Sequence, residues 1–141
     1  MEFNRFESAG FVINWCARLF ERRMAEALRP LGLAPAYLPT LFTLSAVGGA
    51  TQGELAKVSA IQQPTMALTL RRMERDGLIT RVQDETDRRR AIIRLTPRAE
   101  ELMPRVEELA GSINEAAFTG LPAETSAQLI ELLLQTVRNL E

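Results

Sequence analysis

The sequence has no histidine and only one cysteine, Cys16. Without histidine, zinc sites of the Cys/His type and histidine-based catalysis are excluded. A single cysteine cannot form an internal disulfide, which fits a reducing compartment. The sequence also lacks a glycine-rich phosphate-binding loop and paired carboxylates in an apolar context. We therefore expect a protein that is not an enzyme, with no catalytic residue, no metal site and no cofactor.

Long apolar runs are absent too. No stretch approaches the ~18 apolar residues of a membrane span. The first residues, Met1 to Arg5, lack the basic start and apolar run of a signal peptide. These features predict a cytoplasmic protein with no membrane partner. A length of 141 residues, 46% apolar and 25% charged, predicts one globular domain over residues 1–141.

Charge is unevenly distributed along the chain. The net charge is −1, which is unpromising for a protein that binds nucleic acid. Residues 71–98, however, hold nine arginines against five acidic residues, whereas residues 99–141 hold eight acidic residues against two arginines. Because nucleic-acid binding needs only one basic face, this polarity permits it.

Apolar periodicity and turn residues predict the order of elements. Two wide apolar stripes predict a long first helix from Phe6 to Arg29, and alternating segments at 78–83 and 91–95 predict a hairpin. The other expected helices span 35–47, 52–58, 64–76, a segment from 97 that Pro104 either bends or begins, and 129–140. A short helix joined by about four residues to a second helix is a helix-turn-helix. The expected fold is mainly α (α+β), with a winged helix-turn-helix at 35–97 framed by long dimerisation helices in 1–32 and 98–141.

The helix at 64–76 has an outer face suited to DNA. Glutamines near its start can pair with adenine in the major groove, and the helix N-terminus attracts phosphate. The candidate DNA-binding residues on this helix and just before it are Gln62, Gln63, Pro64, Thr65, Leu68, Arg71, Arg72 and Arg75. An ordinary solvated helix with scattered arginines is the alternative interpretation of the helix alone.

The hairpin places three arginines, Arg88, Arg89 and Arg90, at its tip. Such side chains are too long and charged to pack inward, and an arginine is attracted by the potential of a narrow minor groove. Asp87 can orient a guanidinium through a charge-assisted hydrogen bond. A solvated charge run is the alternative, but a basic helix followed by a basic hairpin favours a DNA-binding winged helix.

At this point the sequence resembles the MarR family of bacterial transcription regulators over nearly its whole length. The resemblance rests on Gln52-Gly53-Glu54-Leu55-Ala56, on Met73-Glu74-Arg75-Asp76-Gly77-Leu78-Ile79, and on Asp87-Arg88-Arg89 followed by Leu95-Thr96. It implies a homodimer, a pseudo-palindromic site in double-stranded promoter DNA and a small ligand that releases the DNA. It also implies that Arg89 is the minor-groove arginine and Asp87 its support. Gln62 and Leu68 depart from the Asp and Arg common in the family.

Two further sites follow from the resemblance as expectations. Some family members sense organic peroxides through a cysteine in the first helix, but the register of Cys16 is about two residues different and Tyr37 is the only tyrosine. We expect Cys16 to be a buried packing residue. A pocket for a small aromatic effector is expected among Trp15, Leu19, Tyr37 and Phe42, which are equally consistent with plain core.

The leading interpretation is therefore a homodimeric, ligand-released repressor that binds DNA. One alternative is a regulator that senses peroxide through Cys16. The other is a helical dimeric module that binds proteins and not DNA, against which the three exposed arginines argue.

Overall fold

The computed structural model describes residues 2–141. The helices are α1 (Ala9–Leu28), α2 (Leu38–Val47), α3 (Gln52–Val58), α4 (Gln63–Arg75), α5 (Pro97–Ala117) and α6 (Ala123–Leu140). Short 3-10 turns lie at η1 (Arg5–Glu7), η2 (Arg29–Leu31) and η3 (Pro35–Tyr37). Strands β1 (Ile79–Gln83) and β2 (Ala91–Leu95) form an antiparallel hairpin in which Ile79 pairs with Leu95. The predicted fold class and the order of elements are confirmed.

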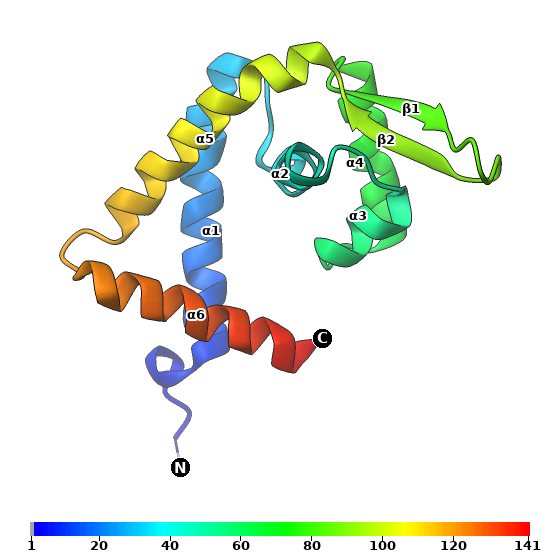
Figure 1. The fold of residues 1–141 in the computed structure, drawn as a ribbon. Coiled ribbons are helices and arrows are strands. Elements are labelled where there is room, and N and C mark those ends of the chain that lie inside the picture. Colours follow the sequence, from blue (N-terminus) through cyan, green and yellow to red (C-terminus); the bar gives the residue numbers. More distant parts are fainter. Residues whose placement is uncertain (1) are drawn as a thin grey trace.

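The α2–β2 segment forms one lobe, on the right of Figure 1. Its core is apolar and nearly free of solvent at Leu41, Leu55, Leu70 and Ile93. Ala50, two residues before α3, forms a bridge with Ile93 in β2, with N–O distances of 3.1 and 2.7 Å. Through this bridge, Ala50 pairs with the β1–β2 hairpin, which is the wing. The bridge thereby links the wing to the segment just before α3.

Local chemistry sets the ends of the helices in this lobe. Thr51 and Glu54 form the predicted capping box of α3, since each side chain bonds the other residue's backbone N–H. Gly77 follows α4 with a φ of +73°, a left-handed conformation that glycine adopts without strain. The backbone therefore turns sharply from the basic helix into the basic hairpin.

The terminal helices form an open frame beside this lobe (Figure 1). Helices α1 and α5 pack together where Met24, Leu28, Met103 and Val106 are buried. The N-terminal half of α1 and all of α6 have no buried residue. The exposed apolar residues of α6 are Leu129, Ile130, Leu132, Leu133, Leu134, Val137 and Leu140. The chain alone thus leaves long apolar stripes uncovered.

Several expected boundaries differ from the structure. Helix α2 begins at Leu38 and not at Pro35, because Pro35–Tyr37 form the separate 3-10 turn η3. The first helix begins at Ala9, not Phe6, because the Ser8 side chain caps it and Asn4 caps a separate 3-10 turn. Helix α5 begins at Pro97 and continues through Pro104, and it is curved in Figure 1. Helix α6 begins at Ala123, earlier than the expected Leu129.

Among the described residues, no single helix is long and apolar enough to cross a membrane. Only the pair 9–31 and 35–47, taken together across a 95° bend, meets the length and composition of a span.

Candidate nucleic-acid interface

Helix α4 presents a polar and basic face to solvent because its apolar residues Met66, Leu70 and Met73 are buried beneath it. All eight predicted contact residues are exposed, namely Gln62, Gln63, Pro64, Thr65, Leu68, Arg71, Arg72 and Arg75. The N-terminus of the helix is open, since Gln62 makes no side-chain cap there. The exposed face can therefore reach a major groove with its first turn and phosphates with its arginines.

Two of these side chains already have partners in the chain. The Oε1 atom of Gln63 accepts a hydrogen bond of 3.1 Å from Nε2 of Gln52, which links α3 to α4. The guanidinium of Arg75 pairs with Asp76 at 3.2 Å. Arg71 and Arg72 have no ion pair among residues 2–141, so they are the more available cations of this helix.

The wing tip is built around Asp87. Its Oδ1 atom accepts from the backbone N–H of Arg89 at 3.0 Å and lies 3.5 Å from Nε of the same residue. The Arg89 side chain is 94% exposed. The arrangement agrees with the support that Asp87 was expected to give: the carboxylate fixes the turn and leaves the far end of the guanidinium open to solvent.

Arg90 differs from the other two tip arginines. Its Nη2 atom lies 3.3 Å from Oε1 of Glu54, and its Nε lies 3.9 Å from Oδ2 of Asp84. The Arg90 side chain thus connects the wing to α3. Arg88, by contrast, forms no ion pair within residues 2–141. We assign Arg90 mainly to holding the wing against α3, and Arg88 and Arg89 to the exposed tip.

The sequence interpretation missed the partners that hold these elements. Glu54 was expected only as a helix cap, and Glu74 as part of a family motif, yet Glu74 also pairs with Arg81 of β1 at 3.3 Å. The pair fixes α4 against the wing. Only the alternation of acidic and basic residues could have indicated these contacts, because Glu54 and Arg90 are 36 positions apart and Glu74 and Arg81 lie on different elements.

Asp76, at the end of α4, joins the α2–β2 lobe to the frame of terminal helices. Its Oδ2 atom accepts from the Tyr37 hydroxyl at 2.7 Å, and its backbone carbonyl accepts from Arg98 at the start of α5. The hydrogen bonds from Tyr37 and then Arg75 lower the pKa of the Asp76 carboxyl. Burial, followed by the bond to Asp76, raises the pKa of Tyr37. The C-terminus of α4 is thereby fixed to both η3 and α5.

The four residues expected to line an effector pocket lie in different surroundings. Tyr37 is buried in the core, and its hydroxyl already donates a hydrogen bond to Asp76. Trp15 packs on Phe6 and Phe11 at the N-terminal end of α1. Phe42 is 38% exposed, while Leu19 lines a cavity between α1 and α5. The structure does not bring the four together.

Cys16 is exposed in the chain, which corrects the prediction that it is buried. No residue in the first half of α1 is buried, because little of the described chain packs over it. Apolar periodicity correctly identified the stripe that contains Cys16, but periodicity cannot tell which chain covers it.

Comparisons with known proteins agree with this geometry. A model of the MarR family matches residues 35–91. An uncharacterised HTH-type transcriptional regulator of Bacillus subtilis, YwoH, is 35% identical over 89 residues, which are 63% of this chain and 64% of that protein. The relative is thus matched over a little under two thirds of its length.

Solved structures share the fold across nearly the whole chain. A MarR family regulator from Listeria monocytogenes, in complex with a 26mer DNA, has a TM-score of 0.88 at 19% identity, covering 94% of this chain and 89% of that one. BpsR of Bordetella bronchiseptica, whose DNA binding is regulated by 6-hydroxynicotinic acid, has a TM-score of 0.87 at 21% identity, covering 97% and 98%. The transcriptional regulator PA3341 is 30% identical, with a TM-score of 0.82, covering 94% of this chain and 98% of that one. Together with the match of the MarR family model to the helix-turn-helix and most of the wing, this relative leads to one conclusion: the chain belongs to the MarR family of transcriptional regulators.

Proposed function

We propose that the protein is a homodimeric repressor that binds pseudo-palindromic promoter DNA and leaves it when a small organic ligand binds. One observation carries the proposal: an exposed basic helix lies beside an arginine wing tip whose turn is braced by Asp87. Helix α4 would enter the major groove and Arg89 the neighbouring minor groove. Arg71 and Arg72 would contact phosphates, which fix the register.

The surface area of the chain supports the homodimer. A compact monomer of this mass, 15.8 kDa, exposes about 7,300 Å². The chain exposes 10183 Å², an excess of roughly 2,900 Å². That excess is several times the ~800 Å² that each partner buries in a standard interface. Because two-fold dimers are the commonest assemblies, a second copy is the simplest cover for α1 and α6.

Two observations support release of the DNA by a ligand. The DNA binding of BpsR, a structural relative, is regulated by 6-hydroxynicotinic acid. The contacts of Asp76 with Tyr37 and Arg98 support a coupling between the frame and α4. A ligand that alters the frame would change the distance between two α4 helices, which must be about 34–36 Å for successive major grooves.

Selection of bound sequences from random duplex DNA tests the proposal. We expect enrichment of a site with two inverted halves, and an affinity that falls steeply with salt as phosphate contacts release counterions. A protein-binding module would enrich no sequence and show no steep salt dependence. That result would exclude DNA binding as the function.

The exposure of Cys16 favours thiol-based regulation as a second candidate. Reaction of an accessible thiolate with an organic hydroperoxide would then release the DNA. We expect Cys16→Ser and the parent to bind DNA equally before and after a stoichiometric hydroperoxide. Release in the parent alone would instead establish the thiol as the sensor.

A further inference from the structure

Leu68 is an exposed apolar side chain in the middle of the basic face of α4. It is 45% exposed, whereas Met66 and Leu70, two positions away on either side, are buried. At 3.6 residues per turn, two positions correspond to a rotation of about 200° around the helix. Leu68 therefore points away from the core of its own lobe and toward solvent.

The residues around Leu68 are those of the proposed DNA-binding surface. Pro64 and Thr65 lie one turn before it, Arg71 and Arg72 lie one turn after it, and all four are exposed. Single exposed apolar residues are common on protein surfaces and by themselves indicate nothing. Leu68 differs because the surface around it is the one proposed to enter the major groove, where the side chain would have to meet a base edge.

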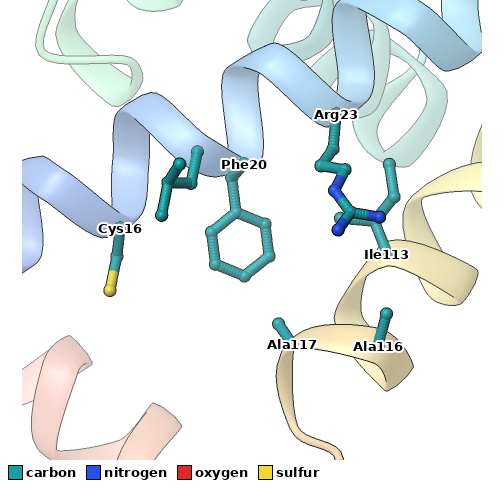
Figure 2. Close-up of a pocket in the computed structure, with 7 residues that line it drawn as sticks. Cys16, Phe20, Arg23, Ile113, Ala116 and Ala117 are labelled. Atoms are coloured by element: carbon teal, nitrogen blue, oxygen red, sulfur yellow. The ribbon is translucent and has the colours of Figure 1, made fainter.

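A second copy of the chain is the proposed cover for the apolar stripes of the terminal helices, and not for Leu68. Those stripes lie on α1 and α6. Figure 2 shows part of this frame, where Cys16, Phe20 and Ile113 border an open pocket between α1 and α5. Helix α4 belongs to the other lobe (Figure 1). Leu68 is thus separate from the surface on which the subunits are proposed to meet.

The chemistry of the major groove limits what a leucine can recognise there. The bases present one methyl group in this groove, the C5-methyl of thymine, and otherwise hydrogen-bond donors and acceptors. A leucine side chain can neither donate nor accept a hydrogen bond. Held against a donor or acceptor, it would remove water from that group without replacing the lost hydrogen bond, which costs free energy. Against the thymine methyl it loses nothing and buries apolar surface.

We propose that Leu68 is a specificity-determining residue, which selects a thymine in each half of the operator by packing against its C5-methyl group. This inference rests on the proposed function. Discrimination by one methyl group requires a fixed helix, and α4 is held near both ends. Gln63 accepts a hydrogen bond of 3.1 Å from Gln52 of α3, and Glu74 pairs with Arg81 of β1 at 3.3 Å. Leu68 lies midway between these two contacts.

Replacement of single thymines by uracil tests the contact, because uracil keeps the base-pairing groups and lacks only the methyl group. The duplex is the operator obtained by selection from random DNA, and fluorescence anisotropy at fixed salt measures its affinity. At one thymine in each half, uracil should weaken binding of the parent about fourfold, the equivalent of about 0.8 kcal/mol for one buried methyl group. Replacing both symmetry-related thymines should weaken binding about 16-fold, since distant sites contribute additively.

Leu68→Ala should bind the thymine and uracil duplexes equally, because the side chain that contacts the methyl group is gone. Its fold should be intact, since Leu68 is exposed, and thermal unfolding would check this. Val47→Ala is the matched control. Val47 is 63% exposed at the end of α2 and belongs to neither α4 nor the wing, so this variant should keep the full preference for thymine.

The proposal is overturned if no uracil substitution weakens binding of the parent, or if Leu68→Ala keeps the parent's ratio between the two duplexes. A kept ratio with weaker binding overall would place Leu68 against the sugar-phosphate backbone. Unchanged DNA binding with altered sedimentation would place it in a protein contact. Failure of the proposed function gives a different result, because the selection would then enrich no sequence. Sequence-selective binding without a methyl effect that depends on Leu68 would retain the regulator and exclude only the thymine contact.

Discussion

At the scale of single residues, Arg89 is the sharpest test of the wing. Arg89→Ala should weaken DNA binding and leave the fold intact, because so exposed an ion pair with Asp87 contributes little to stability. Each subunit would lose one phosphate-neutralising contact. The slope of log K against log[salt] for the dimer should therefore become shallower by roughly 1.8. Fluorescence anisotropy across a salt series would measure it.

Arg105→Ala is the control for this measurement. Arg105 is also exposed, but it lies on α5 and pairs with Glu108 of the same helix at 2.9 Å. It should leave both affinity and slope unchanged. Equal loss in the two variants would show a general charge effect and contradict a specific wing contact.

Tyr37 and Asp76 give a prediction about pH. The pKa of Asp76 is lowered from 3.8, so the folded state favours the carboxylate. This contribution to stability is present at neutral pH and is lost as the pH falls through the lowered pKa. The pKa of Tyr37 is raised from 10.0, so its contribution is lost as the pH rises above that value.

Tyr37→Phe should therefore lower the free energy of unfolding by about 0.5–1.5 kcal/mol at neutral pH, the typical worth of one hydrogen bond. The difference from the parent should shrink in acid, where Asp76 becomes protonated. Urea unfolding at several pH values would measure both effects. A constant difference down to acid pH would mean that the tyrosine acts by packing and not through the carboxylate.

Contacts between near neighbours were predictable from sequence, and contacts between distant residues were not. Asp87 and Arg89 are two positions apart in a turn, so their interaction follows from local geometry. Tyr37 and Asp76 are 39 positions apart, and only the packing of η3 against α4 brings them together. For that reason Tyr37 was expected in a pocket and instead bonds to the end of α4.

At the scale of elements, Gly49 is required at the base of the wing. A Cβ atom there would lie 2.9 Å from Cγ2 of Ile92, which is too close for any real contact. Gly49→Ala should lower the free energy of unfolding by about 1–3 kcal/mol through overpacking. Gly111→Ala, in α5, is a control with nothing within 4 Å of the added carbon, and should raise it by about 0.5–1 kcal/mol. Thermal unfolding of both variants would measure these changes in stability. Equal changes in the two variants would contradict a steric role for Gly49.

Periodicity predicted the helices better than their ends. Helix α6 was expected from Leu129 because its apolar stripe begins there, but its first turns carry Glu124, Thr125 and Ser126 on an exposed helix. Polar residues give no stripe to detect, although Glu124 suits the positive end of a helix. The start of α1 was expected too early, at Phe6, because the N-cap formed by Ser8 was not recognised in the sequence.

At the scale of the whole molecule, amphipathic stripes indicate that a face is covered but not by what. Cys16, in the apolar stripe of α1, was expected to be buried, and within one chain it is exposed. Leu129, Leu133 and Val137 of α6, which was expected to be a dimerisation helix, are exposed as well. The sequence shows which residues of a helix form an apolar stripe. It does not show whether the same chain or a second chain packs against that stripe.

The proposed homodimer can be tested by a substitution far from the DNA-binding surface. Leu133→Asp would place an unpaired charge in the apolar stripe of α6, which costs several kcal/mol if a partner buries it. We expect a monomer or aggregate by sedimentation, and loss of tight operator binding although α4 and the wing are untouched. Two separate monomers would bind the two half-sites independently. They would therefore lose the increase in effective concentration that a dimer gains when its first subunit is bound.

Gln128→Asp introduces the same charge on the polar side of α6 and should change neither assembly nor DNA binding, because Gln128 is exposed and lies outside the apolar stripe. The pair of variants separates the effect of charge from the effect of position. A parent that is monomeric at micromolar concentration and still binds its operator tightly would contradict the dimer. In that case the apolar stripes of α1 and α6 would need a different partner, and the spacing of α4 would be set by the DNA alone.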